Sequence, residues 1–222
     1  MIGQIYPPSS KGHKFILVAT DYFTMWVEAI PLKKVTSANM IDFVKEHIIY
    51  RFGIPQTITI DQGTMFTSGE FDEFAIGMGI KVLNSSPYYA QANGQAEASN
   101  KGIIKLIKWK IEENPRKWHT LLNEALWSYR MACHGSTKVS PYQLVYGHDA
   151  MLPWEIKTRS RRLPFQDQLT ADDYATFMTD ELADLAGHRL RALMSIEENK
   201  QRVVRWYDKK VKAKEFADGD LV

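Results

Sequence analysis

The sequence predicts an α/β domain followed by a long helical segment, and three observations support this. Residues 15–19 are nearly all apolar, which is typical of a strand buried on both faces. In residues 36–83, segments with helical periodicity alternate with short β-branched runs, which is typical of strand–helix–strand crossover units. Residues 172–214 are charged and helical in pattern, with an incomplete apolar stripe. The first part of the sheet should be antiparallel, and the later part should be built from crossovers.

Two strands and a helix open the chain. Residues 12–21 should form the first strand, and residues 26–31 alternate and end at a proline, as its neighbour would. The residues between them would make a short hairpin connection. We expect the helix to be capped by Thr36 or Ser37 and to end at Gly53.

Crossover elements follow the first helix. The pattern predicts a strand over 57–60, a helix capped by Ser68, and a strand over 80–83. A helix over 95–111 should come next, and Pro115 should start another. The buried stripe predicted for that last helix consists of Trp118, Leu122, Ala125, Leu126 and Tyr129.

Composition suggests where domains begin and end. Residues 1–150 should form the core domain, and the basic, proline-flanked residues 151–171 should form a linker. The long helical segment over 172–214 should lean on a partner or link domains. Residues 215–222 resemble a turn that enters a strand, so we expect them to start a further β module.

Charge and cysteine content limit the possible classes of protein. The net charge is only +2, but basic residues concentrate in 83–111 and 200–214, which are therefore candidate polyanion surfaces. The single cysteine, Cys133, excludes an internal disulfide framework and cysteine-based zinc fingers. No apolar run reaches the length of a membrane span. We expect an intracellular protein with no membrane partner.

Two carboxylates, Asp61 and Glu97, are the candidate catalytic and metal-binding residues, with 35 residues between them. Asp61 would follow a strand, at the edge where ligands gather in open α/β sheets. Glu97 would lie in the first turn of a helix, where negative charge is favoured. Such a pair suits Mg²⁺ or Mn²⁺, which prefer oxygen ligands. The alternative is that Asp61 only opens a turn and Glu97 is an ordinary first-turn acid.

A row of lysines follows Glu97 on the predicted helix. At 100° per residue, Glu97, Lys101, Lys105 and Lys108 lie within roughly an 80° arc beside an apolar face. This row is either a track for DNA phosphates or a solvated face.

The polar segment before Glu97 is predicted to be a loop with groups that suit nucleic acid. Tyr88 could stack on a base, and Asn93 and Gln95 could bond phosphates or bases. A loop without such a role is the alternative.

Three runs together resemble one family. Residues 84–97 (NSSPYYAQANGQAE), 52–55 (FGIP) and 60–66 (IDQGTMF) look like motifs of the integrases of gypsy-type long-terminal-repeat retrotransposons and retroviruses, notably plant members. The spacing of Asp61 and Glu97 is also the spacing of that family. Further similar runs are 16–24 (ILVATDYFT), 140–147 (SPYQLVYG) and 216–222 (FADGDLV).

The resemblance implies a ribonuclease-H-like core, with a five-stranded mixed sheet flanked by helices. It implies processing and strand transfer of retroelement DNA ends into target DNA with Mg²⁺ or Mn²⁺. Asp61 and Glu97 would then be the second and third acids of a triad. A homo-oligomer, and nuclear localisation if the protein functions, are further expectations. Positions that contact DNA in relatives match Tyr88, Asn93, Gln95 and Lys101.

The first acid of the triad is harder to place. The resemblance puts it just before a segment like residues 2–7, so we expect an N-terminally truncated core with weak or absent catalysis. Asp21, which ends the first predicted strand, is the substitute to test, and a strand-end role is the preferred reading of it. Two alternatives remain: a non-catalytic nucleic-acid-binding or assembly module derived from an integrase, and a metal-dependent ribonuclease of the same fold.

Overall fold

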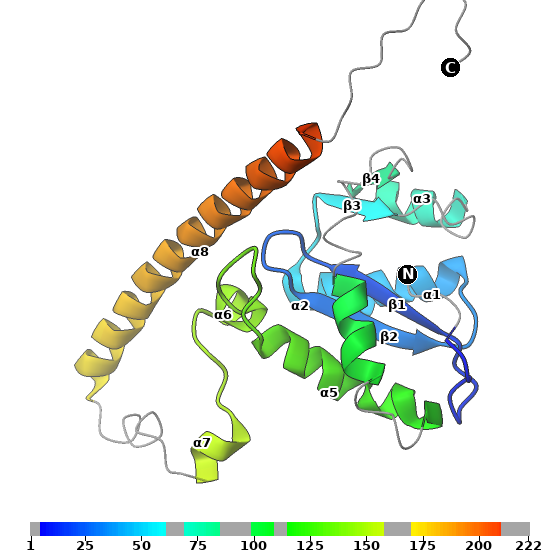
Figure 1. Ribbon diagram of the computed structural model, residues 1–222, viewed down its shortest axis with the longest axis horizontal. Coiled ribbons are helices and arrows are strands. Elements are labelled where there is room, and N and C mark those ends of the chain that lie inside the picture. The colour runs from blue at the N-terminus through cyan, green and yellow to red at the C-terminus, as the bar shows by residue number, and fades with distance from the viewer. Residues whose placement is uncertain (1–4, 61–68, 85–98, 109–114, 158–169, 210–222) are drawn as a thin grey trace, which may run out of the picture. The chain divides into compact units, whose positions relative to one another are not determined.

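The computed structural model divides the chain into two compact units, Met1–Ala132 and Cys133–Val222, and each is described by itself. The residues described are 5–60, 69–84, 99–108, 115–157 and 170–209. The first unit, labelled in Figure 1, contains β1 (Phe15–Thr20), β2 (Val27–Leu32), α1 (Ser37–Phe43), the π-helical segment η1 (Val44–Ile49), α2 (Tyr50–Phe52), β3 (Thr57–Ile60), α3 (Gly69–Gly77), β4 (Lys81–Asn84), a helix over 99–108, the 3₁₀ turn η2 (Pro115–Lys117) and α5 (Trp118–Met131). The second unit contains α6 (Pro141–Tyr146), α7 (Pro153–Lys157) and α8 (Ala171–Asp208).

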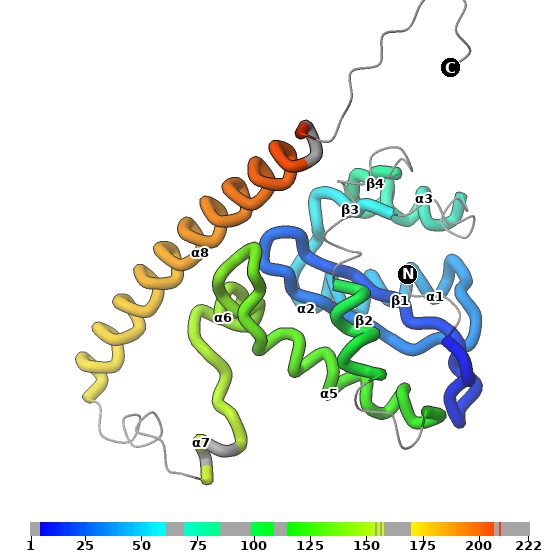
Figure 2. The backbone as a smooth tube through the Cα atoms, in the orientation of Figure 1, coloured from blue at the N-terminus to red at the C-terminus, as the bar shows by residue number. Residues whose placement is uncertain are grey.

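The β1–β2 hairpin is buried on both faces, as the apolar run predicted. Its strands pair antiparallel, from Phe15 opposite Leu32 to Thr20 opposite Val27. Ile16 contributes to a first core, formed with α5 and helix 99–108, whereas Leu17 contributes to a second core, formed with α1, β3 and α3. Figure 2 traces helix 99–108 beside the hairpin and α5. Each fully buried aliphatic side chain contributes about 1.5–3 kcal/mol, so both helical layers hold the hairpin strongly.

The segment from α1 to α2 is the helix predicted between Thr36 and Gly53. The Thr36 side chain accepts a hydrogen bond from the backbone N–H of Asn39, so it is the N-cap. Gly53 follows α2 with a φ of 90°, a conformation that glycine adopts without steric cost. The structure adds the π-helical segment η1, which residue periodicity did not predict.

β3 and β4 form a parallel pair joined by α3, which confirms the predicted crossover. Thr57 lies opposite Lys81, and Ile60 lies opposite Asn84. Ile60 and Phe71 are buried in the second core, the same core that receives Leu17 of β1. The two strand pairs therefore share a core without sharing a hydrogen-bonded ladder.

The predicted five-stranded mixed sheet is not found among the described residues. They contain two separate two-stranded sheets, β1–β2 and β3–β4. The resemblance placed the remaining strand ahead of residues 2–7, and residues 1–4 lie outside the described part of the chain. Because a sheet needs continuous backbone pairing, a shared core alone does not join the two pairs into one.

Helix α5 presents the buried stripe that its sequence predicted. Trp118, Leu122, Ala125, Leu126 and Tyr129 are all at most 5% exposed. They pack with Ile103 and Ile107 of helix 99–108 in the first core. The 3.6-residue period of the apolar positions was therefore a sufficient guide to the packed face of this helix.

A buried carboxylate ties α2 and α5 to β2. Glu28 is 4% exposed, and its Oε1 accepts hydrogen bonds from Trp26 Nε1 at 2.8 Å and Arg51 Nη1 at 2.6 Å. Arg130 Nη2 lies 3.0 Å from the other carboxylate oxygen and also donates to the Val27 carbonyl. We call Glu28, Trp26, Arg51 and Arg130 the Glu28 cluster. Burial of this charge is tolerated because it is paired and hydrogen-bonded.

The second unit is built on contacts between α6 and α8. Ser140 caps α6 through the backbone N–H of Gln143, as its hydroxyl type favours. The Arg189 guanidinium of α8 donates to the Leu144 carbonyl at 3.0 and 3.1 Å. None of the helices among the described residues combines the length and the apolar character that a membrane crossing requires.

Candidate nucleic-acid interface

The structure describes the elements on either side of the predicted acids. Asp61 and Glu97 themselves lie outside the described residues, as do Tyr88, Asn93 and Gln95. The metal-binding and loop assignments made for these five residues therefore stay predictions. What can be built from the structure is the pair of elements to which the two acids are attached.

The first attachment is the end of β3. Ile60, the last residue of that strand, is 7% exposed and packs in the second core. It lies opposite Asn84, the last residue of β4, so both parallel strands end at the same level. Asp61 follows Ile60 directly in the sequence, and the carboxyl ends of parallel strands form the edge at which α/β sheets bind ligands.

The second attachment is the start of helix 99–108. Ser99, two residues after Glu97, is fully buried, and its Oγ lies 2.9 Å from the Tyr129 hydroxyl of α5. A Cβ added to Gly102 would lie 3.2 Å from the Tyr129 ring, so the absence of a side chain there permits this close approach. Burial raises the pKa of Tyr129, and the hydrogen bond with Ser99 partly offsets that rise.

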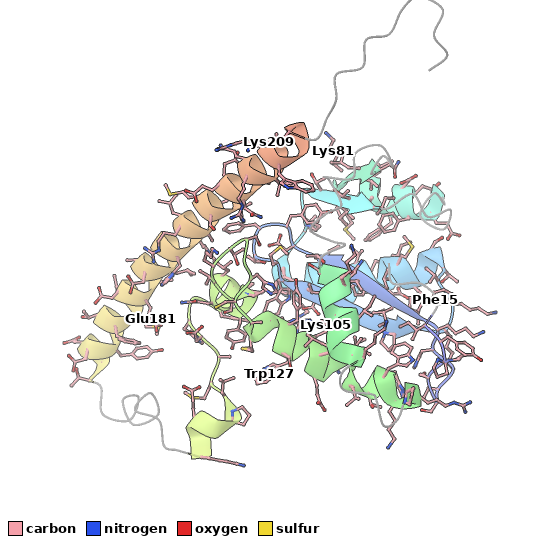
Figure 3. All side chains as sticks on the ribbon, in the orientation of Figure 1. Phe15, Lys81, Lys105, Trp127, Glu181 and Lys209 are labelled. Carbon is pink, nitrogen blue, oxygen red and sulfur yellow. The ribbon has the colours of Figure 1, made fainter. Side chains whose placement is uncertain are left out.

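The lysines of helix 99–108 lie on the face away from the core. Lys101, Lys105 and Lys108 are exposed, whereas Ile103 and Ile107 are buried. Lys105 is labelled in Figure 3. This confirms the predicted split into an apolar face and a lysine row, which we call the lysine face. Three exposed ammonium groups on successive turns can contact a polyanion without disturbing the core.

Asp21 is used within the hairpin turn between β1 and β2. It is exposed, and its Oδ2 accepts hydrogen bonds from the backbone N–H and the hydroxyl of Thr24. The Asp21 backbone also bonds Met25 and Trp26, and Met25 has a φ of 60°. The carboxylate therefore has a turn-capping role of the kind typical of aspartate.

Among the residues that the structure describes, no three histidine, cysteine or acidic side chains lie together as a metal site. The carboxylates predicted to bind Mg²⁺ or Mn²⁺ are outside that part of the chain. Their oxygen donors have the chemistry that these hard ions require.

Tyr129 is a residue whose role the sequence did not predict. Its place in the apolar stripe indicated burial, but its partner Ser99 is 30 residues away, and local patterns carry no signal for such a contact. The hydroxyl pair fixes the first described turn of helix 99–108 against α5, and Ser99 comes two residues after Glu97 in the sequence.

Replacing Tyr129 with Phe should destabilise the first unit by about 1–3 kcal/mol, because Ser99 would keep a buried hydroxyl without its partner. Urea unfolding measures the loss as a lower midpoint at unchanged slope. Tyr50→Phe, which removes a hydroxyl from a side chain of the first unit that is 74% exposed, is the matched control. An unchanged midpoint for Tyr129→Phe would mean that Ser99 finds another partner.

The described fold is similar to that of solved integrase structures. The simian T-cell lymphotropic virus intasome in complex with PP2A regulatory subunit B56 gamma is similar, with a TM-score of 0.54 and 26% identity, over 62% of this chain and 49% of that chain. The HTLV-2 integrase catalytic core domain in complex with magnesium, in its trimeric form, gives a TM-score of 0.51 and 26% identity, over 61% and 87%.

Sequence comparison agrees with the structural class. Residues 3–90 match the family model described as "Integrase core domain". The Pro-Pol polyprotein of feline foamy virus is 34% identical over 150 residues, 68% of this chain and 13% of the relative. The transposon Tf2-3 polyprotein of Schizosaccharomyces pombe is 25% identical over 218 residues, 97% of this chain and 15% of the relative. Residues 3–90 are thus similar to an integrase core domain, the chain is similar to retroviral and retrotransposon polyproteins, and it spans 13–15% of the length of these two relatives.

Proposed function

We propose that this chain is the DNA-joining core of an integrase from a gypsy-type long-terminal-repeat retrotransposon. Its substrates would be the DNA ends of the element and a target duplex. The observation that carries the proposal is the lysine face, which begins four residues after Glu97 on a helix fixed against α5. The matched family model and the polyprotein relatives support the same class of reaction.

Asp61 and Glu97 are the residues that would hold Mg²⁺ or Mn²⁺. When bound, such ions stabilise the charge on the attacking and leaving oxygens of a phosphoryl displacement. The carboxylates supply hard oxygen ligands from two separate elements, a strand end and a helix start. The HTLV-2 core, a structural neighbour, is described in complex with magnesium.

The remaining predicted residues would position DNA. Tyr88 would stack on a base next to the cleaved bond, and Asn93 and Gln95 would hydrogen-bond to phosphates or base edges. Lys101 and Lys105 would neutralise the phosphates that lead away from the acids. A complete five-stranded sheet, assembly into a homo-oligomer on the DNA ends and action in the nucleus belong to the same proposal.

A strand-transfer assay tests the proposal directly. The full chain is incubated with recessed element ends, a target plasmid and Mn²⁺, and joined products are measured. With Asp61 and Glu97 as the only predicted metal ligands we expect weak joining, and Asp21→Asn should leave it unchanged, because an asparagine can still accept the Thr24 N–H in the turn. Loss of joining in Asp21→Asn would assign Asp21 to the metal site.

The second candidate is a non-catalytic nucleic-acid-binding or assembly module derived from an integrase. The observation that favours it is the turn-capping role of Asp21, the candidate for a third acid, whose carboxylate accepts hydrogen bonds from Thr24. DNA binding without any joined product would select this candidate. Failure of both binding and joining would refute both.

Changing Lys101, Lys105 and Lys108 to Gln should weaken DNA binding and flatten its salt dependence. The slope of log affinity against log salt is about −0.9 for each phosphate neutralised, so losing three contacts should reduce it by roughly 2.7. Fluorescence anisotropy between 50 and about 200 mM salt measures the slope.

A control with the same change of net charge is Lys11, Lys33 and Lys34 to Gln, since these lysines are exposed outside helix 99–108. Equal slopes for the two triple variants would contradict a specific phosphate track.

A further inference from the structure

A tight turn precedes β1 and lies against the start of α5. We call residues 9–13 the N-terminal turn. Within it, the Gly12 N–H donates to the Ser9 carbonyl at 2.8 Å, and Gly12 has a φ of 80°, which glycine adopts without steric cost. The Ser10 N–H donates to the Arg116 carbonyl of η2 at 2.9 Å. This backbone hydrogen bond docks the turn on the segment that opens α5.

The side chain of His13 makes the second contact between the turn and α5. Its half-buried ring lies 5.3 Å from the His119 ring and 6.3 Å from the ring of Trp118, measured between centroids. Trp118 is fully buried in the first core. In the part of the chain that the structure describes, Trp118 Nε1 and His119 Nδ1 are buried without a hydrogen-bond partner. His13 therefore packs on these two rings without hydrogen-bonding to those nitrogen atoms.

The Ser9 hydroxyl indicates which ring nitrogen of His13 carries the proton. Ser9 is 5% exposed, and its Oγ accepts from the backbone N–H of Lys11 at 3.3 Å and of His13 at 3.0 Å. A hydroxyl oxygen has two lone pairs and one hydrogen, so both lone pairs are in use. His13 Nδ1 lies 3.0 Å from the same Oγ. The hydroxyl hydrogen is what remains for this contact, so Nδ1 accepts it and the ring is neutral.

The surroundings of His13 also disfavour a positive charge on its ring. Burial lowers the pKa of His13 from its usual 6.5, and His119, Lys33 and Lys11 lower it further. These three groups come from α5, from the residues that follow β2, and from the turn itself. None of them is an acid that could pair with an imidazolium.

We propose that the N-terminal turn is an acid-sensitive contact, which is docked on η2 and α5 while His13 is neutral and is released when His13 takes up a proton. A protonated imidazole has an N–H at both nitrogens. The Nδ1–H would then meet the Ser9 Oγ, whose lone pairs already accept two backbone N–H groups. In the released turn the same N–H reaches water, so protonation favours release.

The pH window follows from the direction of the pKa shift. Because the pKa of His13 is lower in the docked turn than its usual 6.5, docking is strongest above pH 6.5 and weakens as the pH falls below it. The inference uses neither the predicted metal ligands nor the lysine face. It therefore stands independently of the proposed DNA integration.

Hydrogen exchange measured by NMR on the full chain tests the release. The Ser10 amide reports docking, since its acceptor is the Arg116 carbonyl. After correction for the intrinsic pH dependence of exchange, its protection should fall severalfold between about pH 7.5 and about 5.5, with about tenfold as the upper limit. The Lys14 amide, which donates to the Leu32 carbonyl beside the hairpin, should keep its protection and is the internal control.

His13→Asn separates the titration of this residue from other effects of acid. Asparagine keeps a short side chain with an acceptor oxygen but does not titrate, so the Ser10 protection should stay constant over the same range. His148→Asn, which changes an exposed histidine of the second unit, is the control and should keep the pH dependence.

Two results would overturn the proposal. One is an unchanged Ser10 protection across the range in the unchanged chain, and the other is an equal fall in His13→Asn. If His13→Asn does not dock even at the higher pH, the titration of the His13 ring in the unchanged chain decides instead. A midpoint below 6.5 supports the acid-sensitive contact, and a midpoint at or above 6.5 contradicts it.

Discussion

The Glu97→Gln chain is expected to join DNA ends about a thousand-fold more slowly than the unchanged chain. A metal held by the acids supplies several kcal/mol of transition-state stabilisation, and each 1.36 kcal/mol changes the rate tenfold. Glutamine keeps the size of the side chain but removes the charge that the ion requires. DNA affinity should change little, because the lysine face is intact.

The measurement compares strand transfer and DNA binding for the same preparations. Asp61→Asn should behave as Glu97→Gln does. The controls are Glu70→Gln and Asp72→Asn, which remove exposed acids from the first turn of α3. Equal loss in the controls would indicate a general charge effect. Full activity in Glu97→Gln would refute the metal-binding role of Glu97.

Glu28→Ala is expected to destabilise the first unit by about 3–5 kcal/mol, the usual cost of removing one partner from a buried ion pair. Arg130 has a side chain that is only 15% exposed, and it would lose the Glu28 carboxylate that lies 3.0 Å from its Nη2. Arg51 is 38% exposed and can turn to solvent, so most of the cost should come from Arg130.

Hydrogen exchange of peptides from β1 and β2 in rising urea measures this loss within the first unit. Glu28→Gln should lose less than Glu28→Ala, since a glutamine oxygen can still accept from Trp26 Nε1. Glu46→Ala, which removes an exposed acid from the neighbouring segment η1, is the control. A midpoint for Glu28→Ala within error of this control would show that the Glu28 cluster contributes no net stability.

Much of the first unit could be predicted because its signals are local. The apolar run at 15–19 gave the hairpin strand, and Thr36 and Gly53 gave the ends of a helix through capping and a positive φ. The stripe of α5 followed from its period alone. These signals depend on residues a few positions apart, which one sequence displays directly.

The parts that were not predicted depend on distant contacts. Glu28 meets Arg51 and Arg130, which come from two other elements, and Tyr129 meets Ser99 from a separate helix. Neither pairing leaves a periodic trace in the sequence. The separation into two sheets is also a property of backbone pairing, which side-chain patterns report only indirectly.

Some features of the candidate site could be predicted from the sequence, and others required the structure. Residue types and spacing indicated Asp61 and Glu97, and the helical period indicated the lysine face. The hydrogen bonds that occupy the Asp21 carboxylate come from Thr24, three residues away in a turn. The positions of acids in the sequence do not show that the Asp21 carboxylate already accepts these hydrogen bonds. The conformation of the turn shows it.

Two neighbouring residues of α5, Tyr129 and Arg130, connect that helix to two other parts of the first unit. Tyr129 holds the start of the helix that follows Glu97, and Arg130 holds Glu28, which in turn holds Arg51 of α2, four residues before Pro55 and the entry to β3. Helix α5 is therefore tied by hydrogen bonds to helix 99–108 and, through Glu28, to α2. A substitution that shifts α5 is expected to shift helix 99–108, and with it the lysine face.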